Sequence, residues 1–426
     1  MLHRLPQVSM QVAVIGGGVA GVCTAYFLAQ AGHEVVVIER QSNVAEGASF
    51  GSAGVLSPVH ALPWAAPGMP KKLLSMLLKR DAPLSIEPRV NRQLWQWARR
   101  WIAECEIGRY QINAERSYRI AAYSNAVVET LRQQHGFEYE RTRGYLQLYR
   151  TPHERDLAAP VHAFLGERGV PHQVLEPESV YAIEPALRRT AVLSGGLHLP
   201  EDVAGNCPLY CKQVRAAAQS LGVDFHFSSE VTAIETAAGA AAGLFLRIGG
   251  ERFGVDAAVV AAGEGSHALL APLGVKLPFF PVRRYAATAS IRNFDDAPLA
   301  SVSDSSYSVS ITRMGTRMRL AGTAEIGART TDMRPAAIAT LLKVAQQWFP
   351  DAANYNAATK WSGIVPTLPD GAPILGPTPV ANLYLNIGHG ANSWAMAPGC
   401  ARVLADLLSG RATDIDTDGL TMSRYG

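Results

Sequence analysis

The sequence predicts an α/β fold in which a parallel sheet with helices on its faces carries a second, antiparallel sheet as an insertion. Short apolar strand patterns followed by glycine-rich turns recur in three separated parts of the chain, at 11–40, 256–263 and 383–410. Alternating apolar and polar residues, typical of antiparallel strands, fill 279–325 between the second and the third part. One sheet made from three separated segments cannot arise from a tandem of domains. We therefore expect a discontinuous domain with sheet-rich insertions.

The first segment carries a Rossmann-like motif. Gly16, Gly18 and Gly21 form G-x-G-x-x-G between a buried strand at 12–15 and an alanine-rich helix. In such motifs the first glycine permits the tight turn, the second lets the backbone approach a pyrophosphate, and the third lets the helix pack close to the strand. Glu39 follows the second strand, at 34–38, where it can accept hydrogen bonds from a ribose diol. Because strand, helix, second strand and acidic residue agree, the segment predicts a bound dinucleotide and not merely a structural turn.

The next stretch, 45–58, is dense in small residues, which let backbone pass close to a flat ligand; a plain loop is the alternative interpretation. Further on we expect helices at 111–135 and 153–168, a strand at 144–149, and a glycine- and proline-rich loop at 193–210. A helix then runs to Gly222, and strands follow within 223–235 and at 244–248. The apolar strand at 256–263 ends at Gly263, which is how a parallel strand opens onto a ligand crevice. A helix at 334–349 precedes the last strand, turn and helix, at 383–410.

The segment 71–101 differs from the rest of the chain in its charge. It holds eight basic residues against two acidic ones, a net charge of +6 in a chain whose total is +3. Within KKLLSMLLKR four leucines interleave with the basic residues, and three tryptophans follow, as expected of a helix that lies at a membrane surface. The alternative is an amphipathic helix that packs on its own domain.

The bulk properties are those of a globular protein of about two domains. The chain has 426 residues, 48% of them hydrophobic and 18% charged, and a net charge of only +3 is not typical of a nucleic-acid binder. Five cysteines without a regular spacing indicate reduced thiols in a cytosolic protein, and Cys207 with Cys211 cannot complete a metal site. We find no apolar stretch of membrane-spanning length. The first nine residues are too short for a signal peptide, and Met10 could be a second start.

Together these features resemble the FAD-dependent D-amino-acid oxidase and glycine oxidase superfamily, and over nearly the whole length the bacterial D-amino-acid dehydrogenase flavoproteins. Besides the motif at 12–40, the matching stretches include SAGVLSP, PWAAPGMP, GYLQLYRT, GGLHLPED, WSGIVPTLPDGAPILG and LYLNIGHG. The resemblance implies a two-domain, D-amino-acid-oxidase-like fold. Residues 10–90, 180–275 and 358–426 would form the FAD-binding domain, and 91–179 and 276–357 the antiparallel-sheet substrate domain.

The resemblance also implies which residues hold FAD. Gly16, Gly18, Gly21, Glu39 and Arg40 would bind its AMP end, and Val231 would meet the adenine through its backbone. The remaining positions would lie beside the pyrophosphate and the flavin ring: Ser49, Ser52, Ala53, Gly54, Gly388, His389, Gly390 and Ser393. N–H groups at the start of the last helix would stabilise the negative charge of the reduced flavin near N1 and O2. The GHG turn fits FAD better than NAD.

One position departs from the family pattern. Relatives have W-x-G-x-R-P-x-x-P-D, in which the arginine binds the substrate carboxylate, and this chain has Val365 in its place. Valine cannot provide the bidentate hydrogen bonds of a guanidinium. Arg283 and Arg284 stand where the dehydrogenases show lysine and glycine. Our hypothesis is that Arg284, or as second choice Arg313, binds the carboxylate; the alternative is that both pair with surface acids.

The family reaction is hydride transfer from the Cα–H of a D-amino acid to flavin N5, which gives an imine that hydrolyses to a 2-oxo acid and ammonia. It needs no obligatory catalytic residue. Tyr285 and Tyr307 are candidates for closing the substrate over the ring, with His60 near it, although each could equally be an ordinary buried side chain. The electrons would pass to a quinone or respiratory acceptor, with the segment 71–101 on the inner face of the cytoplasmic membrane.

Three alternatives remain open at this point. The substrate could be an imino acid, opine or secondary amine that is held without the usual arginine. The enzyme could be an oxidase that reduces oxygen. The chain could also be a flavin subunit whose activity requires a partner chain.

Overall fold

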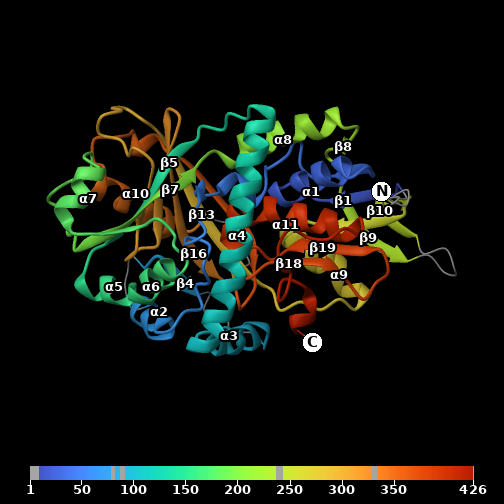
Figure 1. Cartoon of the computed structure of the whole chain (residues 1–426), viewed down its shortest axis with the longest axis horizontal. Coiled ribbons are helices and arrows are strands. Elements are labelled where there is room, and N and C mark those ends of the chain that lie inside the picture. The colour runs from blue at the N-terminus through green and yellow to red at the C-terminus, as the bar shows by residue number, and fades with distance from the viewer. Residues whose placement is uncertain (1–8, 78–81, 87–91, 237–242, 329–332, 426) are drawn as a thin grey trace.

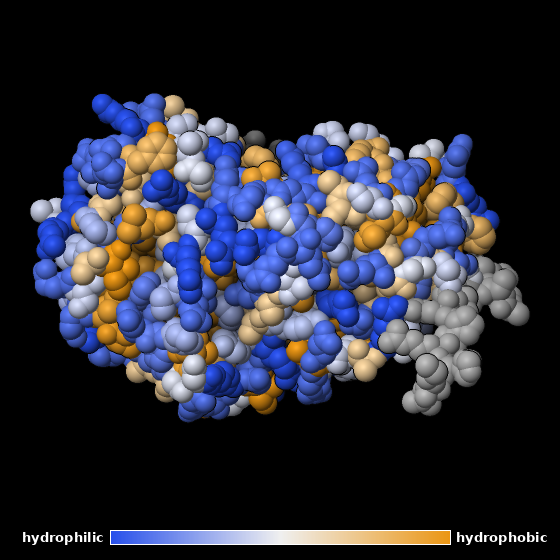
Figure 2. Space-filling view, turned by 45° about the horizontal axis from the view of Figure 1, so that its top comes forward, coloured by the Kyte–Doolittle hydropathy of each residue, from blue (hydrophilic) through white to orange (hydrophobic). Residues whose placement is uncertain are grey.

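The computed structural model describes residues 9–77, 82–86, 92–236, 243–328 and 333–425. Two large sheets lie side by side along the long axis of the molecule, with the N-terminal strand in one and most of the middle of the chain in the other (Figure 1). The long helix α4 (Ile107–His135) crosses the front of the molecule where the two halves meet (Figure 1). The face seen in Figure 2 is mostly hydrophilic, and its apolar residues lie in scattered patches.

The first sheet has six strands in the order β18-β19-β12-β1-β2-β8. All neighbours pair in parallel except β18, which is antiparallel to β19. The three predicted segments therefore meet in one sheet, and the expected α/β fold is confirmed. The bounds of the strands are β1 (Gln11–Ile15), β2 (Glu34–Ile38), β8 (Asp224–His226), β12 (Ala257–Val260), β18 (Ile374–Pro377) and β19 (Leu383–Ile387).

Both faces of this sheet are covered, which explains why its strands are almost wholly apolar. Val12 and Val14 face a core formed with α1 (Val19–Gln30), α8 (Cys207–Ser220) and α11 (Ser393–Leu408). Ala13 and Ile15 face the opposite core. That core is completed by α9 (Ser266–Leu270) and a small antiparallel sheet of β9 (Val231–Thr236), β10 (Leu244–Ile248) and β11 (Glu251–Val255).

The second sheet has ten strands. Its main path runs β17-β13-β16-β15-β14-β5-β7-β3, with β4 paired to β16 and β6 paired to β7. The expected antiparallel pairing is present from β13 to β16, but β14 pairs in parallel with β5, and β16 with β4. The bounds are β3 (Val55–Leu56), β4 (Leu84–Ile86), β5 (Thr142–Tyr149), β6 (Gln173–Leu175), β7 (Gly195–Ala204), β13 (Phe280–Ser290), β14 (Ser301–Asp304), β15 (Val309–Met314), β16 (Arg317–Ile326) and β17 (Thr359–Thr367).

Helix α10 (Pro335–Trp348) covers one face of the second sheet and buries Trp348 completely. Five further helices belong to this half of the molecule: α2 (Met69–Leu77), α3 (Arg92–Glu104), α5 (Pro152–Leu157), α6 (Ala159–Glu167) and α7 (Pro177–Ile183). Single 3₁₀ turns lie at η1 (Ala48–Gly51), η2 (Gly263–Gly265), η3 (Ala271–Leu273), η4 (Tyr355–Ala357), η5 (Gly390–Asn392) and η6 (Met422–Tyr425). All five cysteines are buried and free.

The prediction of a loop at 193–210 is wrong, because this stretch contains the ten-residue strand β7. Pro200 suggested a loop, since proline cannot donate to a ladder of hydrogen bonds. In the structure the pairing of β7 with β5 is interrupted between the pairs Leu199–Tyr145 and Val203–Arg143, and Pro200 lies in this irregular part. β7 and β17 both belong to the ten-stranded sheet, although the proposed boundaries assign 180–275 and 358–426 to the FAD-binding part.

The basic segment 71–101 forms α2, β4 and α3, while its residues Lys79, Arg80 and Arg89 lie outside the described part of the chain. The inner face of α3 packs through Leu94, Trp97 and Trp101 on the end of β13. The alternative of an amphipathic helix that packs on its own domain is therefore realised on this face. Within the described ranges, none of the helices combines the length and the apolar character that a crossing of the bilayer requires.

Candidate functional site

The turn between β1 and α1 can be built only with glycine at two positions. Gly16 has a φ of +110°, and a Cβ atom there would lie 2.6 Å from the carbonyl oxygen of Ala261. A Cβ atom on Gly21 would lie 1.8 Å from the carbonyl oxygen of Gly16, so the helix could not approach the strand. Gly18 is the N-cap residue of α1 and has no side-chain cap. The open N-terminus of α1 therefore suits an anion.

Glu39 stands at the end of β2 beside this turn, as expected. Its carboxylate accepts hydrogen bonds from the backbone N–H of Gly17 at 2.5 Å and of Gln41 at 2.7 Å. The neighbouring Arg40 pairs with Glu264 at 2.6 Å, next to Gly263, which lies in η2 with a φ of +54°. The first and second of the three predicted segments are thus joined at the ends of β2 and β12.

The small-residue stretch is held by hydrogen bonds to α1 and α11, and its strand β3 pairs with β7 of the ten-stranded sheet. Ser49 Oγ accepts from the N–H of Val19 in the first turn of α1, at 3.0 Å. Ser52 Oγ accepts from the N–H of Gly54 at 3.1 Å. The carbonyl oxygen of Gly54 accepts from Trp394 Nε1 in α11, at 3.2 Å. The stretch is therefore a fixed connection between the two sheets and not a plain loop.

A cavity of about 290 Å³ lies between this stretch, the strands β13, β16 and β17, and the turn before α11. Trp361 of β17 forms part of its wall, and its indole lies so close to Gly51 and Gly363 that a Cβ atom on either would clash. Val231 is buried on β9 and is not part of the lining, whereas Ser52, Ala53 and Gly388–Ser393 are. Such a volume suits a small ligand.

The turn Gly388-His389-Gly390 closes one end of the cavity before α11 begins at Ser393. Gly388 has a φ of +82°, and a Cβ atom there would lie 2.4 Å from Leu368 Cδ1. Burial lowers the pKa of His389 to about 4, so its imidazole is neutral at pH 7. Its Nε2 is buried and has no hydrogen-bond partner among the described residues. The turn therefore offers an unused polar atom and a helix N-terminus to a ligand.

Arg284 is a partly buried cation in the wall of this cavity, and its Nε atom is fully buried. Burial lowers the pKa of its guanidinium to about 10, so it remains charged at neutral pH. One Nη donates to the carbonyl oxygen of Gly322 at 3.5 Å, while Nε has no partner among the described residues. None of the described residues that line the cavity is acidic. The site therefore holds a positive charge without a protein counter-charge.

The position of Arg284 relates directly to the missing arginine at 365. In the pairing of β13 with β17, Arg284 lies opposite Gly363, and Val282 lies opposite Val365. Residues two apart on a strand share a face, so Arg284 and Val365 lie diagonally on the same face of neighbouring strands. Both line the cavity.

His60 lies in the same cavity, and its Nδ1 is 3.2 Å from the hydroxyl of Tyr145 on β5. Burial, and then the nearby charge of Arg284, lower the pKa of His60 to about 4. The imidazole is therefore neutral at pH 7 in the absence of a ligand.

The other predicted substrate residues do not present a free polar group to the cavity. Tyr285 borders the cavity, but its hydroxyl donates to Glu325 Oε2 at 2.6 Å and its ring belongs to the core beneath α10. Tyr307 lies beneath Arg150, and Arg313 lies over the ring of Phe294; neither lines the cavity. The sequence reasoning missed Trp361 as a wall residue, although its position in W-x-G-x-x-P next to Val365 could have indicated it.

Comparison with known proteins agrees with this geometry. The family described as FAD dependent oxidoreductase (DAO) matches residues 11–407 of the chain. A D-amino acid dehydrogenase from Bradyrhizobium diazoefficiens is 41% identical over 98% of this chain and 99% of its own, and one from Methylobacterium radiotolerans is 42% identical over 98% and 100%. The chain belongs to the FAD-dependent oxidoreductase family. The crystal structure of glycine oxidase from Geobacillus kaustophilus has the same fold, with a TM-score of 0.76, 23% identity and coverage of 98% and 99%.

The residues of this FAD-dependent oxidoreductase fit its cofactor. The glycine turn and the open N-terminus of α1 suit the pyrophosphate, and Glu39 lies where the adenosine ribose would reach it. His389, whose buried Nε2 has no partner among the described residues, and the residues at the start of α11 line the same cavity as Gly51–Ala53, so that the helix N–H groups lie at this site. These are the donors that the pyrimidine edge of a flavin requires. The assignment of each FAD contact to its residue remains a prediction.

Proposed function

We propose that this enzyme oxidises the CH–NH₂ group of a D-amino acid to an imine, which water then converts to a 2-oxo acid and ammonia. The two relatives at 41% and 42% identity over nearly their whole length are named D-amino acid dehydrogenase. The observation within this chain that carries the proposal is Arg284, a partly buried guanidinium in the wall of a cavity whose described lining residues include no acid.

A substrate carboxylate supplies what the cavity lacks. A buried cation is costly unless a counter-ion and hydrogen bonds compensate it. A guanidinium and a carboxylate can form two parallel, charge-assisted hydrogen bonds, which fix the orientation as well as the position of the anion. Arg284 thus replaces the absent arginine at 365 from the neighbouring strand.

The chain itself binds, orients and shields the substrate. Arg284 would hold the carboxylate at one side of the cavity, and the small residues Gly51–Ala53 would leave room for a flat ring on the other. Trp361 and the buried wall exclude water from the space between them. FAD, when bound, supplies the acceptor for the hydride from Cα. Fixed proximity of the reacting atoms then accounts for most of the rate.

Replacement of Arg284 by methionine tests this proposal. We expect KM for D-alanine to rise about 100-fold, because a charge-assisted pair and its orientation are lost. Arg313→Met is the matched control, since this arginine lies outside the cavity, and it should leave KM unchanged. An unchanged KM in Arg284→Met, with FAD still bound, would contradict the proposal.

The electron acceptor is proposed to be a quinone or another respiratory acceptor, reached by a peripheral contact with the inner face of the cytoplasmic membrane. Its support is the outer face of α2 and α3, the basic-apolar face, where Leu74, Trp95 and Ile102 are 67%, 66% and 55% exposed. Lys71, Arg92, Arg99 and Arg100 lie exposed among them. Apolar side chains with surrounding cations suit an anionic lipid surface.

Assays distinguish the three alternative functions from the proposed one. Formation of peroxide at a rate equal to substrate consumption would indicate an oxidase. Reduction of the flavin by secondary amines or cyclic imino acids, but not by primary D-amino acids, would indicate an imino-acid or opine substrate. Turnover only after addition of another chain would indicate a flavin subunit.

A further inference from the structure

His60 and Arg284 share one cavity, and no described acidic residue lines it. The two side chains come from separate elements, His60 from the loop after β3 and Arg284 from β13. Neither is explained by packing alone, because Arg284 is a partly buried cation with no acid among the described lining residues, and His60 is a partly buried imidazole near that cation. The substrate proposed above is a zwitterion. Its carboxylate would supply a counter-ion for Arg284, and its ammonium would supply a proton to His60.

We propose that His60 accepts the proton of the substrate ammonium, and that carboxylate binding to Arg284 is what enables it to do so. This inference rests on the proposed function. The ammonium must lose a proton before Cα can release a hydride, because the nitrogen lone pair has to assist. One N–H bond of the ammonium breaks, and one N–H bond forms on the imidazole. This step is a proton transfer without oxidation or reduction.

The surroundings of His60 leave one ring nitrogen for this task. Nδ1 lies 3.2 Å from the Tyr145 hydroxyl, and the backbone N–H of His60 donates to Ser57 Oγ, so the ring and its loop are both held. With Nδ1–H donating to the Tyr145 oxygen, Nε2 keeps its lone pair. Among the described residues, Nε2 has no hydrogen-bond partner, and the side chain borders the cavity.

The charged and titratable groups around His60 explain the coupling. Arg284 faces it from β13 and disfavours a second positive charge. Tyr145 on β5 bonds to it, and its hydroxyl is influenced by Ser303 and by Asp202 on β7. Asp202 is itself buried, which raises its pKa to about 6, and it interacts with Ser57. His389 and Tyr285 border the same cavity, the former neutral and the latter bonded to Glu325.

Substrate binding and product release would then drive a cycle of protonation. The carboxylate neutralises Arg284, which removes the like charge that keeps His60 unprotonated, and the imidazole can take the proton. When the product leaves with its carboxylate, the charge of Arg284 is uncompensated again. His60 then releases its proton to solvent. A carboxylate alone should therefore raise the pKa of His60, without any reaction.

A histidine NMR titration of the FAD-loaded enzyme tests this coupling directly. With sodium propionate as a carboxylate that has no amine, we expect the pKa of His60 to rise by at least one pH unit. In Arg284→Met the pKa should be higher at the start and propionate should not move it. His198 on β7, also partly buried but outside the cavity, is the control and should not respond. A His60 pKa that propionate leaves unchanged in the native enzyme would overturn the proposal.

The pH profile of His60→Gln provides the second test. We expect the limiting rate of flavin reduction by D-alanine at pH 7 to fall about 100-fold, the usual size of a general-base effect. The rate should recover about tenfold per pH unit towards alkaline pH, where the free amine forms in solution, while KM changes little because Arg284 is intact. A profile that superimposes on that of the native enzyme contradicts the role of His60. If no D-amino acid reduces the flavin of the native enzyme, the proposed function fails, and the propionate titration still decides the coupling.

Discussion

Arg284 and Val365 occupy diagonal positions on β13 and β17, and both face the cavity. Exchange of the arginine between two neighbouring strands keeps a guanidinium in the site while changing the strand that supplies it. With the role proposed for Arg284, this arrangement would let a chain without the usual arginine bind a carboxylate.

The exchange can be reversed by mutation. Arg284→Gly alone should raise KM for D-alanine about 100-fold. The double variant Arg284→Gly with Val365→Arg should recover at least tenfold of that loss, since position 365 also lines the cavity. Steady-state kinetics with an artificial dye measures both. Equal KM values for the native enzyme and Arg284→Gly would rule out the carboxylate role.

At the residue scale the sequence predicted positions where the backbone chemistry is strict. Gly16 and Gly21 are required because a Cβ atom would clash with backbone atoms, and this requirement is visible in the motif itself. Arg284 is a candidate for binding the carboxylate only because the arginine expected at position 365 is absent. Tyr307 and Arg313 are candidates by their chemical type alone. Without the strand register, the sequence does not indicate to which face of a sheet a residue points.

At the element scale, α3 connects the wall of the cavity with the basic-apolar face. The side chain of Trp97 on the inner face of α3 donates from Nε1 to the carbonyl oxygen of Thr367, which borders the cavity, at 3.0 Å. The same helix thus joins the site on one side and exposes Trp95 on the other.

We predict that this face binds anionic vesicles. Trp95→Gln with Ile102→Gln should weaken cosedimentation with phosphatidylglycerol vesicles about tenfold, because two exposed apolar side chains no longer enter the interface. Val192→Gln with Leu299→Gln is the control, since these residues are 68% and 57% exposed on other elements. Binding that is equal in both double variants would show that the face has no special role.

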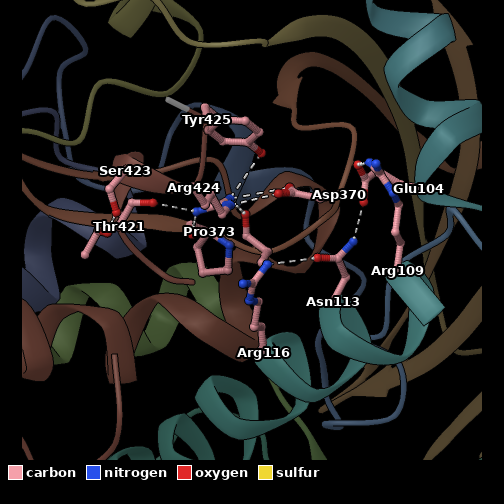
Figure 3. Close-up of polar contacts among 11 residues, drawn as sticks. Glu104, Arg109, Asn113, Arg116, Asp370, Pro373, Thr421, Ser423, Arg424 and Tyr425 are labelled. Atoms are coloured by element: carbon pink, nitrogen blue, oxygen red, sulfur yellow. Dashed lines mark hydrogen bonds and ion pairs between the residues drawn. The ribbon is translucent and has the colours of Figure 1, made fainter. Parts of the chain in front are cut away.

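The loop between β17 and β18 is fixed by the C-terminal turn η6. Arg424 forms an ion pair with Asp370 at 2.8 Å, and both side chains are only 6% exposed (Figure 3). Arg424 also donates to the carbonyl oxygen of Pro373 (Figure 3) and to that of Ala372. The next residue in the loop, Gly371, borders the cavity. The end of the chain therefore supports the wall of the site.

Arg424→Met should reduce the free energy of unfolding by about 3–5 kcal/mol, because the carboxylate of Asp370 stays buried without its cation. Ser423→Ala in the same turn should change it by less than about 0.5 kcal/mol. Urea denaturation of the FAD-loaded protein measures both. A loss below about 1 kcal/mol in Arg424→Met would mean that solvent or another group replaces the arginine.

The elements that the sequence predicted least well are those that depend on distant partners. β7 was expected to be a loop because of its glycines and Pro200, and it is a strand because β5, β6 and β3 pair with it. Local propensity carries no information about such partners. Helices α10 and α11, by contrast, have their pattern within their own sequence and were predicted to within a few residues.

At the scale of the whole molecule, buried carboxyl groups make stability depend on pH. Burial raises the pKa of Glu184 to about 7, although the N–H of Leu299 donates to it at 2.9 Å. The unfolded chain has a glutamate pKa of about 4.3, so between these values the folded state holds a proton that the unfolded state has lost. The stability that this group contributes is complete below about pH 4.3 and is lost as pH rises through about 7.

Glu184→Gln should therefore flatten the decline in stability between about pH 4.3 and pH 7, because an amide does not titrate. Thermal unfolding at a series of pH values measures this decline. Glu178→Gln is the control: its carboxylate is 82% exposed and paired with Arg189, and its replacement should leave the slope unchanged. An identical slope in Glu184→Gln and the native protein would show that other groups cause the pH dependence.

The two sheets of the molecule contribute different parts of the site. The parallel sheet provides the glycine turn and the helix N-termini, and the ten-stranded sheet provides Arg284, Val365 and Trp361. The cavity lies where the two meet, which the sequence predicted through its three separated segments.

Anaerobic reduction of the bound flavin, followed by its absorbance, tests the proposed reaction most directly. D-alanine should bleach the native enzyme, L-alanine should do so far more slowly, and ethylamine, which lacks the carboxylate that Arg284 would bind, should not bleach it at a measurable rate. Bleaching by ethylamine as fast as by D-alanine, or no bleaching by any D-amino acid, would contradict it.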